Sequence, residues 1–143
     1  MAAPAPMAYL AGFFDGEGSV AIKRNKRHSY ILVLVVGNTD PTVLHLFHQH
    51  FGGFFPRPRL RPGWKPFYTW QASTGPAERC LRALLPHLRV KRAQAELALK
   101  FRKLMLQNAG HGQVPRDELR VRREAYRLEM KQLNLRGASE GGE

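Results

Sequence analysis

The chain has 143 residues, 43% of them hydrophobic, and its 23 lysines and arginines against 11 aspartates and glutamates give a formal net charge of +12. This length and apolar content predict one domain with a core, which excludes a largely disordered protein. The charge favours a polyanionic partner (DNA, RNA or an anionic membrane), although a merely soluble basic protein would show the same balance.

The single cysteine excludes an intrachain disulfide, and no run approaches the roughly 18 apolar residues of a membrane span. The N-terminal "MAAPAP" has neither basic residues nor a long apolar run, so no signal or transit peptide is expected. We expect an intracellular, cytoplasmic and nucleoid-associated protein, with an organellar origin left open. Residues 1–7 are predicted to be flexible, residues 8–136 to form one domain, and residues 137–143 to be a disordered tail.

The first half of the chain predicts helices and hairpins in turn. "AYLAGFFD" indicates a helix of about two turns. Residues 19–25 alternate and the apolar "YILVLVVG" follows a polar turn, which predicts a two-stranded hairpin. "NTDPTVLHLFHQHFGG" predicts a helix with Asp40 as N-cap, Pro41 at its first position and Gly52-Gly53 as its stop. "FFPRPRLRPGWKPFYTWQAS" predicts a second hairpin, whose prolines favour edges or bulges.

Three helices are predicted in the second half. "TGPAERCLRALLPHL" indicates a helix ending near Pro86, and "VPRDELRVRREAYRLEMKQLNL" a last helix opening at Pro115. Between them, "RVKRAQAELALKFRKLMLQ" predicts a helix supported by a Glu96–Lys100 pair and one shared apolar face: Val90, Ala93, Leu97, Phe101 and Leu104. The order α-β-β-α-β-β-α-α-α predicts an α+β fold in which helices pack on one face of a four-stranded antiparallel sheet.

The stretch "YLAGFFDGEGSV" combines small residues with acids. Ala8, Gly12 and Gly16 recur every four residues, so one helical face would allow the close approach of another backbone, from this chain or from a second copy. Asp15 and Glu17 stand at the end of the predicted helix. By spacing alone, such an acid is more often a cap or a surface charge than a metal ligand.

The nonamer "LAGFFDGEG", Leu10 to Gly18, resembles the LAGLIDADG motif of homing endonucleases. "PHLRVKRAQAELALK" resembles the family's later helix, Pro-x-Leu-x-x-Lys-x-x-Gln-Ala-x-Leu-x-Leu-Lys, and "NTDPTVLHLFHQHFGG" the helix after its second strand. The resemblance covers about residues 8–136 and implies the α-β-β-α-β-β-α fold. Because the motif occurs once, it also implies a homodimer whose motif helices meet at the two-fold axis through Ala8, Gly12, Phe13 and Gly16.

The resemblance implies a magnesium-dependent active site. Its second acid, Glu17, would hold the metal, with the backbone carbonyl of Gly16 as a further ligand, whereas Asp15 would organise the helix end. Lys91 matches the basic residue that polarises the attacking water or the scissile phosphate, and Asn38 the polar residue that positions metal-bound water. Mg²⁺ prefers such oxygen ligands, and Ca²⁺ is expected to support binding without cleavage.

One face of the predicted sheet carries polar side chains suited to the major groove. Alternation places Tyr68, Trp70 and Ala72 in the core, whereas the second strand is apolar on both faces and cannot be oriented. A solvated sheet face is the alternative. The predicted DNA-contacting residues are Lys23, Asn25, Arg57, Arg59, Arg61, Lys65, Thr69 and Gln71.

Two other residue types carry weaker signals. The spacing of His45, His48 and His50 does not gather them on one helical face, so they are interpreted as surface residues rather than a metal site. Cys80 is predicted to be a small buried hydrophobe.

The predicted function is a site-specific homing endonuclease that cuts both strands of a long pseudo-palindromic DNA site and promotes the spread of its own intron or intein-like element. No membrane and no small-molecule cofactor are expected. One alternative is the same fold acting without cleavage, as an intron maturase or a DNA-binding regulator. The other is a general basic nucleic-acid-binding module that would bind all sequences alike.

Overall fold

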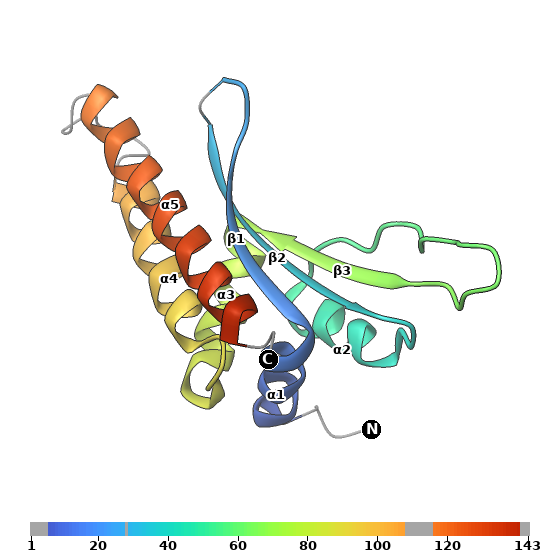
Figure 1. The fold of residues 1–143 in the computed structure, drawn as a ribbon. Helices are drawn as coiled ribbons and strands as arrows, with labels where there is room; N and C mark the ends of the chain where they lie inside the picture. Colours follow the sequence, from blue (N-terminus) through green and yellow to red (C-terminus); the bar gives the residue numbers. More distant parts are fainter. Residues whose placement is uncertain (1–5, 28, 108–115, 141–143) are drawn as a thin grey trace.

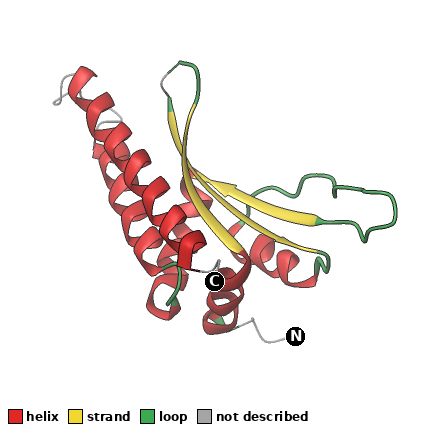
Figure 2. Ribbon diagram, viewed as in Figure 1, coloured by secondary structure: helices red, strands yellow, loops and turns green. Residues whose placement is uncertain are grey.

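The computed structural model describes residues 6–27, 29–107 and 116–140, and in this part of the chain helices lie on one side of a twisted antiparallel sheet (Figures 1 and 2). The predicted α+β class is confirmed. The elements are α1 (Met7–Glu17), β1 (Gly18–Arg24), β2 (Tyr30–Asn38), α2 (Thr42–Phe51), β3 (Tyr68–Ser73), α3 (Thr74–Leu84), a 3₁₀ turn (Leu85–His87), α4 (Arg92–Gln107) and α5 (Arg116–Glu140).

The sheet has the order β1-β2-β3, and β2 pairs with both neighbours. Gly18 lies opposite Val36 on one side, and Trp70 lies opposite Val36 on the other. The outer edge of β1 is covered by α5, where the side-chain amide of Asn134 donates to the carbonyl oxygen of Val20 over 2.9 Å. This contact occupies a strand edge that would otherwise be open to pairing with another chain.

The predicted hairpin before β3 is only partly a hairpin. Residues 54–67 form a long excursion with two isolated bridges. Phe54 pairs with Gln71 of β3, and Arg59 pairs with Phe67, the residue just before β3. Pro56 and Pro58 lie between these bridges and have no N–H to donate, so the ladder is interrupted. In the described residues the sheet therefore has three regular strands and an irregular edge, instead of four strands.

Alternation along the strands separates a core face from an outer face. Trp70 and Ala72 are buried as predicted, whereas Tyr68 is half-buried. The structure also orients β2: Leu32, Leu34 and Val36 enter the core, and the outer face receives a second apolar set, Ile31, Val33 and Val35.

The start and stop signals of α2 are close to those predicted. Asp40 Oδ1 accepts hydrogen bonds from the Thr42 backbone N–H at 2.9 Å and from the Thr42 hydroxyl at 2.7 Å. The helix begins at Thr42, one residue after Pro41. It ends at Gly52, whose φ of 76° is a conformation that favours glycine.

The predicted face of α4 needs correction. Val90 precedes the helix and is 67% exposed, and Ala93 is exposed as well. Glu96 pairs with Arg92 at 3.1 Å, one turn towards the N-terminus, and not with Lys100. The buried residues are Gln94, Ala95, Leu97, Ala98, Phe101 and Leu104.

The last helix, α5, runs antiparallel to α4 beside β1 (Figure 1). It continues to Glu140, into the segment predicted to be a disordered tail, while residues 1–5, 141–143 and Pro115 lie outside the described residues. No helix in the described part of the chain is long and apolar enough to cross a membrane.

Candidate metal centre and nucleic-acid interface

The motif helix α1 presents a free carboxylate where it ends. Glu17 is the last residue of the helix, is exposed, and has no hydrogen bond or ion pair with any other described residue. The N–H of the next residue, Gly18, donates to the Phe14 carbonyl. A Cβ at Gly18 would lie 2.6 Å from the Phe14 ring, so only glycine allows this abrupt turn from helix to β1.

These groups suit a hard divalent cation. The carbonyl oxygens in the last turn of a helix have no partner further along it, and they carry the negative end of the helix dipole. Glu17 and the Gly16 carbonyl therefore offer oxygen ligands of the type Mg²⁺ prefers. Among the described residues no three His, Cys, Asp or Glu side chains gather where they could hold a metal ion.

Asp15 has a different task from Glu17. Its two carboxylate oxygens accept hydrogen bonds from the backbone N–H groups of Arg89 and Lys91, each at 2.9 Å. The Lys91 carbonyl in turn accepts the Ala95 N–H in the first turn of α4. Asp15 therefore caps the start of α4 and fixes the Lys91 backbone next to the end of α1. The resemblance to the family motif implied that Asp15 organises a helix end, and the structure shows that it also holds the segment before α4.

Asn38 is brought towards the same end of the sheet. Because Gly18 lies opposite Val36 in an antiparallel pair, Asn38 is level with the last turn of α1. Its Oδ1 accepts the Asp40 N–H at 2.9 Å, which closes the turn into α2. The side-chain N–H groups of Asn38 make no hydrogen bond to a described residue and stay available to a ligand. Lys91 lies immediately before α4 and is half-buried.

The outer face of the sheet carries some of the predicted DNA contacts. Lys23, Arg57 and Arg59 are exposed, and Gln71 is half-buried. Thr69 is only 8% exposed because the Phe67 ring lies over Gly37 beside it, so Thr69 offers little surface to a ligand. Ile31, Val33 and Val35 form the middle of this face, which is thus basic at its margins and apolar at its centre.

Arg61 and Lys65 lie at the tip of the long excursion rather than on regular strands. The Trp64 N–H donates to the Arg61 carbonyl at 3.0 Å, which closes a turn that Gly63 completes with φ 79°. The Arg61 guanidinium lies 5.1 Å from the centre of the Trp64 ring, and that of Arg59 lies 5.9 Å from the Phe67 ring. The strand along which Arg57, Arg59 and Arg61 were predicted to alternate is therefore replaced by an irregular segment, in which all three are exposed.

Asn25 shapes the tip of the β1–β2 hairpin. Its Oδ1 accepts the N–H groups of Arg27 and Ser29, both at 2.9 Å, and its own N–H donates to the Ser29 carbonyl. The sequence pattern did not predict this turn-forming role. Only the amide N–H groups of Asn25 remain for the DNA contact predicted from the sequence.

The small-residue face of α1 is open in a single chain. Ala8, Gly12 and Gly16 are exposed, and no atom lies within 4 Å of a Cβ placed on either glycine. Phe13 is half-buried, with its ring centre 6.3 Å from that of Phe47. A hollow of about 520 Å³ adjoins this face and is lined by Ala8, Gly12, Asp15, Pro86, His87, Leu88, Arg89 and Arg92.

The histidines and the cysteine have structural positions. His45 stacks on Phe55 with ring centres 4.8 Å apart, and His48 meets the same ring edge-on at 5.8 Å. These contacts hold the beginning of the long excursion against α2. Cys80 is fully buried as predicted, and burial raises the pKa of its thiol.

The chain is similar to known proteins in structure. No protein-family model matches the chain, and no curated protein is significantly similar in sequence. The homing endonuclease I-CvuI, in complex with its target, is 22% identical over 89% of this chain and 80% of its own, with a TM-score of 0.70. The homing endonuclease I-TnaI is 18% identical over 96% of this chain and 99% of its own, with a TM-score of 0.63.

The LAGLIDADG homing endonuclease I-GzeII, in complex with a DNA target, is 17% identical over 78% of this chain but only 39% of its own, with a TM-score of 0.54. At these identities the likeness shows the fold. The chain has the fold of the LAGLIDADG homing endonucleases, and the resemblance predicted from "LAGFFDGEG" is confirmed at that level.

Proposed function

We propose that the chain is a single-motif LAGLIDADG homing endonuclease, which cuts both strands of a long pseudo-palindromic DNA site as a Mg²⁺-dependent homodimer. The observation that carries the proposal is the exposed, unpaired Glu17 at the end of the motif helix, with Lys91 fixed nearby through Asp15. The fold supports it, because I-CvuI and I-GzeII have the same fold and are bound to DNA targets. Cleavage would promote the spread of the intron or intein-like element that carries the gene.

The residues at this site have separable roles. Glu17 and the Gly16 carbonyl would hold the metal, which when bound would activate a water and offset charge on the phosphate. The Lys91 ammonium would donate to a phosphate oxygen, a contact that strengthens as negative charge develops there. The Asn38 amide would orient the attacking water. The basic margins of the sheet would supply affinity through the DNA phosphates.

Two copies are needed to complete this arrangement. One chain brings a single Glu17 to the site and half of a DNA-binding surface. The match spans less than half of I-GzeII, so one chain of that length can contain two such units. A homodimer with α1 packed on its copy through Ala8, Gly12, Phe13 and Gly16 would supply the same pair and would read a two-fold symmetric site.

The test separates binding from cleavage. Duplexes are first selected from a randomised library by binding in Ca²⁺, and the selected duplex is then incubated with Mg²⁺ or EDTA. Glu17→Gln keeps the side-chain size but removes the charge that holds the metal, so cleavage should fall by orders of magnitude while binding survives. Lys91→Met should slow cleavage and retain most binding, because one lysine is a small part of the basic surface.

The matched control is Glu129→Gln, which removes one exposed acid from α5, away from the proposed site. It should cut at the wild-type rate. If Glu17→Gln also cuts at the wild-type rate, Glu17 is a structural residue and the proposed metal site is wrong. If the wild type binds one sequence but never cuts with any divalent metal, the maturase or regulator alternative replaces the nuclease.

A further inference from the structure

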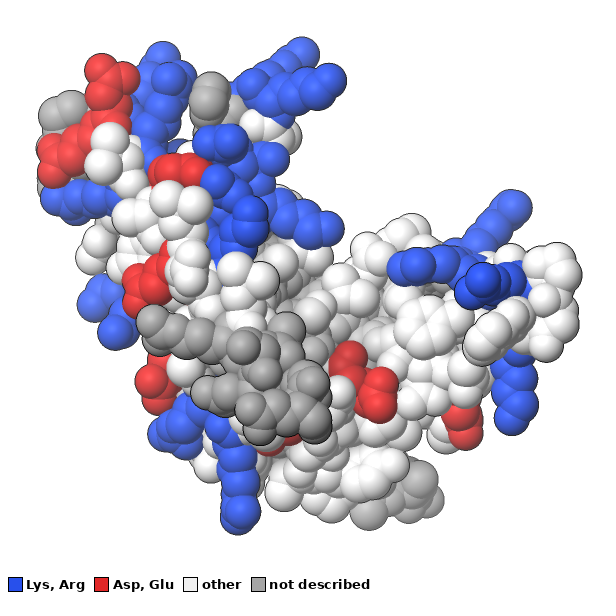
Figure 3. All heavy atoms as spheres, in the orientation of Figure 1, with Lys and Arg blue, Asp and Glu red and all other residues white. Residues whose placement is uncertain are grey.

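Four arginines meet between the tip of the β1–β2 hairpin and the first turns of α5. They line a hollow of about 260 Å³ that is completed by Leu119, and we call them the arginine cluster: Arg27, Arg116, Arg120 and Arg123. The three on α5 are spaced i, i+4 and i+7 and so share one helical face. Figure 3 shows lysine and arginine side chains gathered over this end of the molecule.

The charge of the arginine cluster is not compensated within the described part of the chain. None of the four guanidinium groups forms an ion pair or donates a side-chain hydrogen bond to another described residue. The Nε of Arg123 is buried without any hydrogen-bond partner. Buried polar groups in native proteins are nearly always paired, so an unpaired donor at the wall of a hollow indicates that an acceptor is missing.

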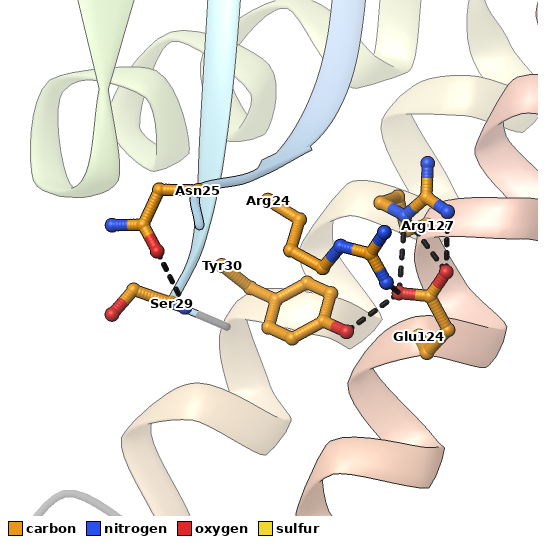
Figure 4. A network of polar contacts seen from close by, with 6 residues as sticks. All are labelled: Arg24, Asn25, Ser29, Tyr30, Glu124 and Arg127. Atoms are coloured by element: carbon orange, nitrogen blue, oxygen red, sulfur yellow. Dashed lines mark hydrogen bonds and ion pairs between the residues drawn. The ribbon is translucent and has the colours of Figure 1, made fainter. Parts of the chain in front are cut away.

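The neighbouring acids of α5 are engaged elsewhere or lie apart. Glu118 pairs with Arg122 at 2.7 Å. Glu124 accepts hydrogen bonds from Arg127, from Arg24 at 3.2 Å and from the Tyr30 hydroxyl at 2.5 Å (Figure 4). Asp117 is exposed in the first turn and makes no ion pair with a described residue.

The arginine cluster is held in place by hydrogen bonds of two neighbouring residues, Glu124 and Asn25. The Glu124 network joins both strands of the hairpin to α5, through Arg24 on β1 and Tyr30 on β2. Asn25 fixes the turn that presents Arg27. The hairpin and the helix are therefore fastened to each other directly below the cluster, so its charges are brought together before any ligand binds.

We propose that the arginine cluster is a second phosphate-binding site, which grips the backbone of duplex DNA past the hairpin tip, outside the surface covered by the sheet. This proposal rests on the proposed function, because Arg27 lies on the same hairpin as Lys23, which is proposed to contact the DNA target. Arginine forks match phosphate oxygens bidentately, and four of them together suit a chain of phosphates better than a single anion. The cluster would add affinity without reading sequence.

The test measures the salt dependence of binding to a fluorescent mixed-sequence DNA duplex in EDTA. The wild type is compared with the double variant Arg120→Gln/Arg123→Gln and with Arg122→Gln, a matched control on another face of α5 whose charge is already paired with Glu118. Each phosphate contact removed should reduce the magnitude of the slope of log K against log salt by about 0.9. The slope of the double variant should therefore be smaller by about 1.8, and that of the control should be unchanged. Arg120→Lys/Arg123→Lys should keep most of the slope.

Thermal melting shows whether the double variant is folded; if it melts early, the exposed Arg120→Gln alone replaces it, with an expected loss of about 0.9. A slope unchanged from the wild type in a folded variant overturns the phosphate site. A change seen with single-stranded RNA but not with the DNA duplex overturns the DNA assignment. Cleavage is measured separately, on the selected duplex in Mg²⁺. A wild type that cuts there, while the variants bind with an unaltered salt slope, contradicts this inference alone and leaves the proposed function standing.

Discussion

Asp15 and Glu17 are two residues apart in the motif, yet their carboxylates face different surroundings. Asp15 accepts two backbone hydrogen bonds from residues 89 and 91, and Glu17 has no partner among the described residues. Residues two apart on a helix point to nearly opposite sides, which separates a structural acid from a free one. The motif therefore combines a helix cap with a proposed metal ligand.

Replacing Asp15 by Ala should affect both stability and catalysis. The loss of the cap on α4 is expected to cost about 1–2 kcal/mol, seen as a lower midpoint in urea unfolding. Cleavage of the selected duplex should also slow, because the Lys91 backbone loses its anchor. Asp117→Ala, at an exposed position of α5, is the control and should change neither. An Asp15→Ala variant as stable as the wild type would contradict the capping role.

The sequence suggested candidate residues for the site, but not the contacts that hold them. The resemblance of "LAGFFDGEG" to the family motif implied Glu17 and a separate role for Asp15, and the resemblance of "PHLRVKRAQAELALK" to the later helix implied Lys91. The hydrogen bonds from residues 89 and 91 to Asp15 join segments far apart in the chain, and such contacts leave no local pattern. The turn formed by Asn25 was missed although Asn is typical of turns, because alternation along residues 19–25 was given more weight.

Among the strands, β2 and residues 54–67 show how far the alternation of apolar and polar residues can predict which side chains are buried. β2 is apolar on both faces, so only its register with β1 and β3 reveals that Leu32, Leu34 and Val36 enter the core. The prolines correctly indicated an irregular edge, yet a strand was still expected there. The missing N–H groups of Pro56 and Pro58 leave the two isolated bridges.

The contact between the hairpin and α5 predicts a dependence of stability on pH. The hydrogen bonds from Arg127, then that from Tyr30, lower the pKa of Glu124 from 4.5 to about 2. A carboxyl with a lowered pKa in the folded state stabilises the protein above its unfolded pKa, and this contribution is lost as the pH falls through the folded value. The stabilisation should therefore be complete above about pH 5 and should disappear towards pH 2.

The measurement is the thermal midpoint across this pH range for the wild type and for Glu124→Gln. The midpoint temperature of the wild type should fall further on acidification than that of the variant, since the variant has no carboxyl to protonate at this position. Glu129→Gln, on an exposed face of the same helix, serves as the control and should follow the wild type. Parallel curves for the wild type and Glu124→Gln would show that Glu124 does not fasten the hairpin to α5.

At the scale of the whole molecule, the fold leaves the motif helix open where the proposal needs a second copy. Ala8, Gly12 and Gly16 are exposed, with space beside both glycines. The sequence predicted this face from its four-residue spacing, but spacing could not tell whether another part of the same chain fills it. In the described residues nothing does, which favours the second copy.

Gly12→Leu should therefore disrupt the dimer while leaving the chain folded. A leucine at this position has room in a single copy but would force two closely packed helices apart. Sedimentation should show a dimer for the wild type at micromolar concentration and monomer or aggregate for the variant. Leu106→Ala, at an exposed site on α4, is the control and should remain dimeric. A well-folded wild-type monomer at micromolar concentration would contradict the dimer.

The proposed function requires that two copies of this chain each cut one strand of a symmetric DNA site with the help of a metal. It is tested most directly by mapping the 5′ and 3′ ends that the wild-type protein releases on both strands of its selected duplex. We expect one cut in each strand, at positions related by the two-fold symmetry of the site, in Mg²⁺ and not in EDTA. Cuts in one strand only, cuts scattered over unrelated sequences, or no cut with any divalent metal would contradict it.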